Sequence, residues 1–313
     1  MRLCADIGGS FVDMGIVDGR GDIRDRRRHP TPVINWPALV ALFRTALSDH
    51  AAVLDPHAPV CIALAGVADP ATGTIVSSNI ASIHGRRFGD DLSKALGRPV
   101  SLINDADAFA LAEATLGAGR DHRRVFGIIL GTGVGGGLIE DRRVLVDAHG
   151  IGGEWGHGEI LVDSLIAPGS VPVFECGCGR TGCLDTVGGA RGMERLHVFL
   201  HGAQFTSLDI TAGWIAGDAA CTATIDYYTR LLAGPIAMFL NSFPATIVPV
   251  AGGLSNCEPL IELLDRRVRV GMLTRPVTPV VVQTELRDRA GLLGAALGSG
   301  RFLSPPALAQ VAR

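Results

Sequence analysis

The same pattern, an apolar strand followed by a glycine turn and a second strand, occurs twice in this chain. The first copy is ADIGGSFVDMGIV at residues 5–17, and the second is FGIILGTGVGGGLIE at residues 126–140. The chain's 41 glycines fall in short clusters beside apolar runs, where a backbone must turn tightly or approach a ligand closely. A pattern that restarts in this way predicts two related α/β halves that face one cleft.

Strands and helices alternate along both halves, which favours an α/β fold. In the first half we expect strands at 2–7, 11–18, 59–66 and 99–103, and helices at 37–47 and 104–119. In the second half we expect strands at 124–130, 138–146, 245–253 and 279–283, and helices at 218–243, 256–272 and 286–297. We place a small α/β lobe at 1–110 and a large α/β lobe at 111–313. The last helix, at about 286–298, is expected to pack back on the small lobe.

The composition excludes several classes of protein. The formal net charge of −3 provides no broad basic face for nucleic acid. The one basic cluster, RDRRRH at 24–29, is expected to be a solvated hairpin or loop. Asp6 interrupts the first apolar run, so we expect no signal peptide, and no stretch reaches the ~20 apolar residues of a membrane span. The odd count of seven cysteines predicts a reducing cytoplasm, where thiols serve metal binding or packing.

The two glycine turns are candidates for binding phosphate groups. The run GTGVGG has the spacing of a dinucleotide-binding fingerprint, but a β-like stretch follows it where that fold needs a helix. The chain also lacks a GxxxxGK[ST] P-loop. A glycine hairpin can still bind anions through its backbone N–H groups, and Ser10 and Thr132 add hydroxyl donors. Either turn alone fits a plain β-hairpin, whereas two turns in corresponding places favour a nucleotide clamp between the lobes.

Two acidic positions follow predicted strands. Asp6 precedes the first turn, where a carboxylate can help to hold Mg²⁺ through water or can simply cap the turn. Asp105 opens a helix at the end of a buried strand, where it can cap that helix or act as a general base toward an attacking hydroxyl. Asn104 would then hold a neighbouring hydroxyl. Ligand sites of α/β folds lie at such strand ends.

The stretch CGCGRTGC at 176–183 concentrates three of the seven cysteines. Together with His157 of GEWGH, residues Cys176, Cys178 and Cys183 make a set of one nitrogen and three sulfur ligands, which suits a structural tetrahedral Zn²⁺. Unmodified packing thiols are the alternative, while a disulfide is disfavoured by the reducing compartment. A zinc ion here would tie the segment that carries Glu154 to the one that carries Asp185.

Taken together, these motifs resemble those of the ROK family of repressors, open reading frames and sugar kinases. The resemblance covers almost the whole chain and implies the two-lobed, actin-like ATPase fold, which is ribonuclease H-like with a cleft between the lobes. It is carried by DIGGS, LAGVADPATGTIVSSNI, NDADAFALAEA, LGTGVGGGLI, VAGGLSN and, as its most specific part, GEWGH with CGCGRTGCLD. Within the family, GTGVGGGLI and GGARGMERL are similar to those of bacterial N-acetylglucosamine kinases.

The resemblance implies ATP-dependent phosphorylation of a sugar 6-hydroxyl, with ATP, Mg²⁺ and a structural Zn²⁺ as cofactors and a cytoplasmic homodimer as the assembly. Asp105 is implied to be the catalytic base. The implied sugar contacts are Gly66, Asn79, Asn104, Asp105, Glu154, His157 and Asp185. The implied phosphate contacts are Gly8, Gly9, Ser10, Gly131, Thr132 and Gly133, with Asp6 beside them and Gly253 near the adenosine.

Three positions depart from the family pattern. Phe11 stands where a lysine is usual, Asp107 where an asparagine is usual, and Asp185 where a glutamate is usual. These departures keep open a catalytically weakened sugar-sensing protein, and the sugar could also be that of a glucokinase or a fructokinase. A transcriptional repressor is not expected, because the first hairpin begins at residue 2 and leaves no helix-turn-helix ahead of it.

Overall fold

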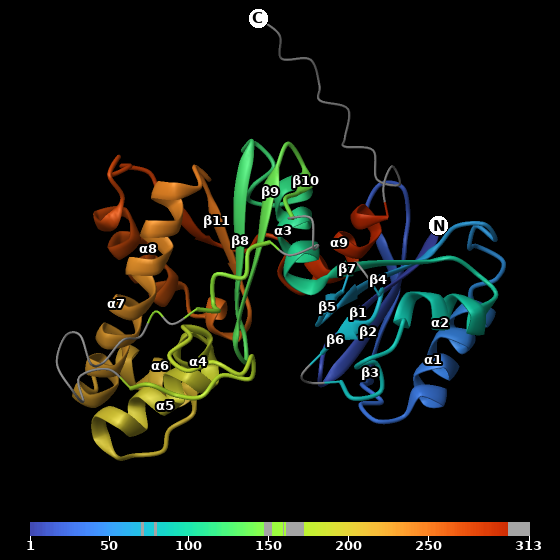
Figure 1. The fold of residues 1–313 in the computed structure, drawn as a ribbon. Helices are drawn as coiled ribbons and strands as arrows, with labels where there is room; N and C mark the ends of the chain where they lie inside the picture. The colour runs from blue at the N-terminus through green and yellow to red at the C-terminus, as the bar shows by residue number, and fades with distance from the viewer. Residues whose placement is uncertain (70–71, 78–79, 147–151, 159, 161–171, 300–313) are drawn as a thin grey trace, which may run out of the picture. The chain divides into compact units, whose positions relative to one another are not determined.

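The computed structural model describes residues 1–69, 72–77, 80–146, 152–158, 160 and 172–299 of the chain (Figure 1). Two compact units emerge from its internal contacts. The first comprises residues 1–117, 142–152 and 286–313, and the second comprises residues 118–141 and 153–285. The sequence places a domain boundary between 110 and 111, whereas the observed grouping keeps the helix at 105–116 whole. The α/β fold class is confirmed, since each unit combines helices with a β-sheet.

The first unit is built on a five-stranded sheet with the order β3-β2-β1-β4-β7. Strands β1, β4 and β7 are parallel, so their carboxyl ends meet at one edge of the sheet. Strands β2 and β3 continue the sheet in antiparallel fashion, and the register pairs Asp6 with Asp13. The strands are β1 (Arg2–Ile7), β2 (Phe11–Val17), β3 (Ile23–Pro30), β4 (Val60–Leu64) and β7 (Val100–Asn104), with a small hairpin of β5 (Val67–Ala68) and β6 (Ile75–Val76).

The first helix of this unit begins with a capping residue and a proline. The side chain of Asn35 accepts a hydrogen bond from the backbone N–H of Ala38 and so caps this helix, and Pro37 lies near its start.

The last helix, α9, packs against α3 and against β1 and β4. A Cβ atom on Gly294 would overlap the carbonyl group of Ala108, so only glycine lets α9 and α3 approach this closely. The helices are α1 (Trp36–Asp49), α2 (Phe88–Leu96), α3 (Asp105–Leu116) and α9 (Ala290–Gly298), the last preceded by the short 3-10 helix η2 (Arg287–Arg289).

The basic run at 24–29 lies in β3, the edge strand of this sheet, which forms an antiparallel hairpin with β2; of the two expected arrangements, a hairpin or a loop, the structure has the hairpin. Its arginines pair with carboxylates that are distant in sequence: Arg28 contacts Asp13 at 2.7 Å, and Arg27 contacts Asp49 at 3.1 Å. Charged side chains on an edge strand also discourage pairing with a strand of another molecule.

The second unit has a sheet with the strand order β9-β8-β11-β12. Strands β8 and β9 form an antiparallel hairpin, and β11 and β12 add to it in parallel. The strands are β8 (Arg124–Leu130), β9 (Val134–Glu140), β11 (Val248–Ala251) and β12 (Val281–Gln283), and a two-residue strand β10 (Arg143–Val144) follows β9. The helices are α4 (Asp185–Gly188), α5 (Ala190–His201), α6 (Ser207–Ile215), α7 (Ala219–Ser242) and α8 (Glu258–Gly271), with the 3-10 helix η1 (Gly253–Asn256).

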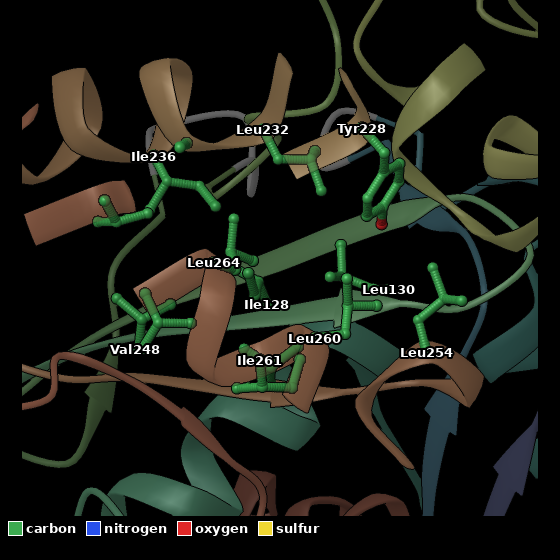
Figure 2. Packing of buried hydrophobic residues seen from close by; sticks show 14 of the residues in the cluster. Ile128, Leu130, Tyr228, Leu232, Ile236, Val248, Leu254, Leu260, Ile261 and Leu264 are labelled. Carbon is green, nitrogen blue, oxygen red and sulfur yellow. The ribbon is translucent and has the colours of Figure 1, made fainter. Parts of the chain in front are cut away.

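Each unit has its own hydrophobic core. In the second unit, side chains of the long helix α7 and of α8 belong to one core cluster with those of the sheet, and Figure 2 shows them facing one another. The buried hydroxyl of Tyr228 donates a hydrogen bond to the carbonyl oxygen of Gly188 at 2.6 Å, so this large side chain buries no unsatisfied polar atom. The residues labelled in Figure 2 are Ile128, Leu130, Tyr228, Leu232, Ile236, Val248, Leu254, Leu260, Ile261 and Leu264.

Within the described ranges, no helix combines the length and the apolar character that are needed to cross a bilayer.

Candidate functional site

The first glycine turn joins β1 to β2 through Gly8, Gly9 and Ser10. The turn closes on itself, because the N–H of Gly8 donates to the carbonyl oxygen of Phe11 at 3.0 Å. Thr31, just after β3, holds the outside of the turn: its hydroxyl donates to the carbonyl oxygen of Gly8 at 2.6 Å, and its N–H donates to that of Ser10 at 3.0 Å. The turn is therefore braced in one conformation, as a preformed anion-binding turn requires.

Asp6 lies directly before this turn, in a group of carboxyl side chains. Burial raises the pKa of Asp6 to about 7, and the charges of Asp105 and Asp13 act in the same direction, while those of Arg26 and Arg28 lower it. Such a cluster of carboxyl groups is suited to a hydrated divalent cation.

Asp13, on the strand next to Asp6, is the anchor of this group. It accepts hydrogen bonds from Arg26 at 3.1 Å and from Arg28 at 2.7 Å, and these contacts hold its pKa below the usual value despite partial burial. The guanidinium group of Arg28 also lies over the ring of Phe11, 5.5 Å from its centroid. Phe11, which stands where a lysine is usual, thus has the guanidinium cation of Arg28 from β3 beside its ring.

Asn104 and Asp105 form the junction between β7 and α3. The side-chain oxygen of Asn104 accepts hydrogen bonds from the N–H groups of Ala106 at 2.9 Å and Asp107 at 3.2 Å, so Asn104 caps the helix. Its side-chain amide donates to the carbonyl oxygen of Gly66 at 3.2 Å. Asn104 is therefore the N-cap residue and fixes the first turn of α3. The Asp105 side chain begins in that turn, and its Oδ1 atom also accepts the N–H of Ala106 at 3.0 Å.

The second glycine turn joins β8 to β9 through residues 131–133. The N–H of Gly131 donates to the carbonyl oxygen of Gly133 at 3.0 Å, and the side chain of Thr132 is exposed. The strand resumes at Val134, earlier than the sequence predicts, because residues 134–137 pair fully with β8. A strand and not a helix follows the turn, so the exclusion of a dinucleotide-binding fold is confirmed.

The glycines within β9 make room for the segment that contains GEWGH. A Cβ atom on Gly136 would lie 2.6 Å from the carbonyl oxygen of Gly153 and as close to the ring of Trp155. The indole N–H of Trp155 in turn donates to the carbonyl oxygen of Gly135 at 3.0 Å. The glycine run GVGGG therefore serves close packing along β9 as well as the turn itself.

Gly252 and Gly253 end β11 beside the start of the second turn. Gly252 has a φ of +90°, and a Cβ atom there would overlap the backbone of Leu130 and Gly131. The hydroxyl of Ser255 donates to the carbonyl oxygen of Gly252 at 2.8 Å and steadies this corner. Gly253, expected near the adenosine, thus lies at the start of η1, close to the turn that is expected to contact phosphates.

His157, Cys176, Cys178 and Cys183 come together in the second unit as a candidate metal centre. One ligand atom from each lies within 4.8 Å of all the others. The Nδ1 atom of His157 is 3.6 Å from the sulfur of Cys176, and the sulfurs of Cys178 and Cys183 are 3.7 Å apart. A tetrahedron with Zn–S bonds of about 2.3 Å has edges of about 3.8 Å, so these residues fit a zinc ion.

The loop that carries the cysteines is tightly hydrogen-bonded. The N–H of Cys176 donates to the carbonyl oxygen of Arg180 at 2.8 Å, and the N–H of Gly179 donates to that of Cys176 at 3.0 Å. Gly179 has a φ of +85°, a left-handed conformation that glycine adopts without strain. A backbone hydrogen bond from Arg180 lowers the pKa of the Cys178 thiol, which favours the thiolate form that a metal binds.

Glu154 lies on the far side of the His157 ring from the cysteines. Its carboxylate is 3.7 Å from the Nε2 atom of His157, whose Nδ1 atom faces Cys176. Burial raises the pKa of Glu154, and the charge of His157 opposes this shift. In zinc centres a carboxylate that accepts the second ring N–H of a ligand histidine orients the ring. Glu154 lies on that side of His157, at 3.7 Å and so beyond hydrogen-bond distance.

The predicted site residues fall into one group in each unit. In the first unit, the turn and the carboxyl groups near it lie at the carboxyl end of β1, and the Asn104–Gly66 contact joins the ends of β7 and β4. In the second unit, Asp185 lies between the glycine turn and the cysteine cluster. Asn79 lies outside the described residues. The first group is Asp6, Gly8, Gly9, Ser10, Gly66, Asn104 and Asp105; the second is Gly131, Thr132, Gly133, Glu154, His157, Cys176, Cys178, Cys183, Asp185 and Gly253.

Three residues around the first group were not predicted. Thr31 braces the glycine turn, Asp13 gathers the two arginines, and Gly291 leaves space for Asp6, since a Cβ atom on it would overlap that carboxylate. The sequence could have indicated Asp13, because it lies two residues after Phe11 and side chains two residues apart on a strand lie on the same face. Thr31 and Gly291 carried none, because their roles depend on which segments the fold brings next to the turn.

Comparisons with known proteins assign the chain to a family. The model of the ROK family matches residues 2–298. The N-acetyl-D-glucosamine kinase of Aliivibrio fischeri (strain ATCC 700601 / ES114) is 32% identical over 292 residues, which cover 93% of this chain and 96% of that protein. The N-acetyl-D-glucosamine kinase of Vibrio parahaemolyticus serotype O3:K6 is 31% identical over 295 residues, covering 93% of this chain and 97% of that protein.

Solved structures show the same fold. The ROK hexokinase from Thermus thermophilus has a TM-score of 0.81 and 28% identity, over 95% of this chain and 97% of that one. The ROK family glucokinase from Streptomyces griseus, crystallised with glucose and AMPPNP, has a TM-score of 0.76 and 26% identity, over 94% of this chain and 97% of that one. The predicted actin-like ATPase fold is thereby confirmed. With its sequence matched from residue 2 to residue 298, this chain belongs to the ROK family.

Proposed function

We propose that this chain transfers the terminal phosphoryl group of ATP to the 6-hydroxyl of N-acetyl-D-glucosamine. ATP-dependent sugar kinase activity follows from its family and from relatives that are N-acetyl-D-glucosamine kinases over almost the full length. The choice of sugar and of hydroxyl is the proposal. The sugar is supported by the relatives that are N-acetyl-D-glucosamine kinases. Phosphoryl transfer to a hydroxyl is supported most directly by Asp105, a carboxylate at the first turn of α3 whose backbone Asn104 fixes at the edge where β1, β4 and β7 end.

Asp105 is proposed to act as the general base. As the sugar oxygen forms its bond to the γ-phosphorus, the bond from that phosphorus to the β,γ-bridging oxygen breaks and ADP leaves. The hydroxyl proton passes to the Asp105 carboxylate, and the product is the sugar 6-phosphate. Gly66 and Asn104, joined by a hydrogen bond at 3.2 Å, are proposed to line the sugar near this base.

The glycine turns are proposed to bind the nucleotide. In the first unit this assigns Gly8, Gly9 and Ser10 to phosphate oxygens and Asp6 to a hydrated Mg²⁺. In the second unit it assigns residues 131–133 to phosphate oxygens and Gly253 to the adenosine side. The braced conformation of each turn supports this, because a rigid turn loses little entropy when it binds.

Glu154 and His157 of the second unit, together with Asn79 of the first, are the remaining proposed sugar contacts. The resemblance also implies Asp185, but its Oδ1 atom accepts the N–H of Val134 and its Oδ2 atom lies beside the sulfur of Cys176, so Asp185 is not proposed as a sugar contact. Cys176, Cys178, Cys183 and His157 would hold a zinc ion, which would supply structural cross-linking and no chemistry on the phosphoryl group. Through the His157 ring, this set would hold the segment of Glu154 in place.

An ATP-coupled assay across five sugars tests the proposed substrate: N-acetylglucosamine, N-acetylmannosamine, glucose, mannose and fructose. We expect kcat/KM to be highest for N-acetylglucosamine, and phosphorus–carbon coupling in the NMR spectrum of the product to place the phosphate at C6. Glucose or fructose as the best substrate would instead identify a glucokinase or fructokinase, and Streptomyces griseus glucokinase is a structural neighbour that supports that alternative. Tight sugar binding with no turnover on any of the five would indicate a weakened sugar sensor.

A cytoplasmic homodimer completes the proposal. Its support is a group of exposed apolar side chains at the ends of α7 and α8, where Met238 is 64%, Val270 73% and Leu273 86% exposed. Light scattering on the purified chain at micromolar concentration should give twice the chain mass of 32.7 kDa. A single-chain mass at that concentration would remove the dimer from the proposal.

A further inference from the structure

Asp185 makes contacts that do not match those of a residue devoted to the sugar. One carboxylate oxygen, Oδ1, accepts a hydrogen bond from the N–H of Val134 at 2.8 Å. The other, Oδ2, lies 3.7 Å from the sulfur of Cys176. Val134 is the first residue of β9 and directly follows the second glycine turn. One side chain thus connects the turn expected to contact phosphates with the cysteine–histidine cluster.

The backbone around Asp185 is fixed as firmly as its side chain. The N–H of Asp185 donates to the carbonyl oxygen of Gly156 at 2.9 Å, and the N–H of Ala190, five residues later, donates to that of Gly131 at 2.7 Å. The segment 185–190 therefore contacts both ends of the turn: Ala190 at Gly131 and Asp185 at Val134. A turn held at both ends keeps the direction of its remaining N–H groups.

The contact between the turn and the carboxylate leaves no spare room. A Cβ atom on Gly133 would overlap Oδ1 of Asp185, and one on Gly189 would lie 2.5 Å from the carbonyl oxygen of Thr132. A side chain on Gly133 would therefore have to push the carboxylate away from Val134. The absence of a side chain at 133 is a requirement of this contact, in addition to any requirement of a ligand.

We propose that Asp185 is a positioning residue for the second glycine turn, and that it sets the enzyme's affinity for the phosphate groups of the nucleotide. This inference rests on the proposed function, because it takes the turn at 131–133 to contact ATP. Asp185 acts by accepting the Val134 N–H, and its negative charge is not required for this. The aspartate is short enough to reach the adjacent backbone from the start of α4, so the departure from the usual glutamate suits a backbone contact.

Asp185→Ala and Asp185→Asn separate this role from a sugar contact. Asparagine keeps an oxygen that can accept the Val134 N–H, so Asp185→Asn should retain nucleotide affinity, whereas Asp185→Ala removes the acceptor. Because the N–H groups of the turn lose their fixed direction when this hydrogen bond is lost, Asp185→Ala should raise the Kd for AMPPNP, measured without sugar, by about tenfold. The Kd for N-acetylglucosamine, measured without nucleotide, should change less than threefold in both variants.

Gly133→Ala tests the same contact from the side of the turn. It should raise the Kd for AMPPNP as Asp185→Ala does, and the double variant should bind no more weakly than the weaker single variant, because both changes break one contact. Gly234→Ala is the matched control, since its Cβ atom meets nothing within 4 Å and its φ is not positive, and it should leave the Kd unchanged.

Amide hydrogen exchange provides a readout that does not depend on turnover. The Val134 amide should exchange faster in Asp185→Ala than in the wild type and at the wild-type rate in Asp185→Asn, with equal zinc content in all three. Wild-type exchange and wild-type AMPPNP affinity in Asp185→Ala would overturn the inference, as would loss of zinc in that variant. Selective loss of sugar affinity in Asp185→Asn would instead make Asp185 a sugar ligand. None of these results depends on which sugar, if any, is phosphorylated, so failure of the proposed function remains distinguishable.

Discussion

Gly291 of α9 lies so close to Asp6 of β1 that a single Cβ atom on it would overlap the Asp6 carboxylate. The last helix of the first unit thereby contributes to the surroundings of a carboxyl group near residue 1 of the sequence. The negative charge of Asp105 also raises the pKa of Asp6. Strand β1 and the helices α3 and α9 therefore all contribute to the surroundings of the Asp6 carboxyl group.

Gly291→Ala should displace Asp6 while leaving the sugar side of the site unchanged. If Asp6 holds the Mg²⁺ as proposed, its displacement by about 1 Å predicts a loss of about a hundredfold in kcat. Calorimetric titration should show unchanged affinity for N-acetylglucosamine, which serves as the internal control for folding. Wild-type kcat in Gly291→Ala would show that Asp6 has no part in the reaction.

Asp6 should make stability fall as the pH rises. Its pKa is near 7 in the folded protein and 3.8 as the ordinary value, so between these limits the folded state binds more protons than the unfolded state. The stabilising contribution of protonated Asp6 is complete below pH 4 and is lost as the pH rises through 7. Asp6→Asn removes the titrating group and so does not lose this contribution. The melting temperature of the variant minus that of the wild type should therefore increase from pH 5 to pH 8. A pH-independent difference would contradict the shift, and Asp121→Asn, at an exposed residue of the second unit, is the matched reference.

Asp105→Asn should abolish turnover and preserve sugar binding. Removal of a general base predicts a fall in kcat of about 10²–10⁴-fold, because no other group would be positioned to take the hydroxyl proton. Single-turnover assays with ATP and calorimetry with sugar alone measure the two effects separately. Asp90→Asn, on the exposed side of α2, is the control and should retain full activity. A tenth of the wild-type rate in Asp105→Asn would exclude the base role.

The strands around the two turns were predictable because their signal is local. Apolar residues and glycines at 2–17 and 124–140 determine β1, β2, β8 and β9 within a few residues. For the basic run of β3 the sequence left a hairpin and a loop both open, because the partners of its arginines, Asp13 and Asp49, are known only from the fold. The helices α2, α5 and α6 were not assigned, although α6 begins with a capping box between Thr206 and Asp209.

The candidate site likewise has features that the sequence predicts and contacts that only the fold shows. The proximity of Asp6 to Asp105 follows from parallel strands that end at one edge, and the cysteine–histidine set follows from ligand chemistry. The contacts of Asp185 with Val134, and of Gly291 with Asp6, join segments 51 and 285 residues apart in the sequence. No periodicity or motif encodes such a pair, because it depends on how α4 and α9 pack.

The cysteine–histidine cluster should contain one zinc ion per chain, and that ion should stabilise the second unit. Zinc bound to the folded state alone contributes its binding free energy to stability, so a chelator should lower the melting temperature of the wild type. Cys183→Ser, at a ligand that is 0% exposed, should lose the zinc and most of the chelator effect. Cys257→Ser is the matched control, because Cys257 is a free cysteine of the same unit outside the cluster, and it should retain both. Elemental analysis of protein purified without added zinc decides whether the cluster binds zinc. A zinc content near zero in the wild type would contradict the proposed zinc site.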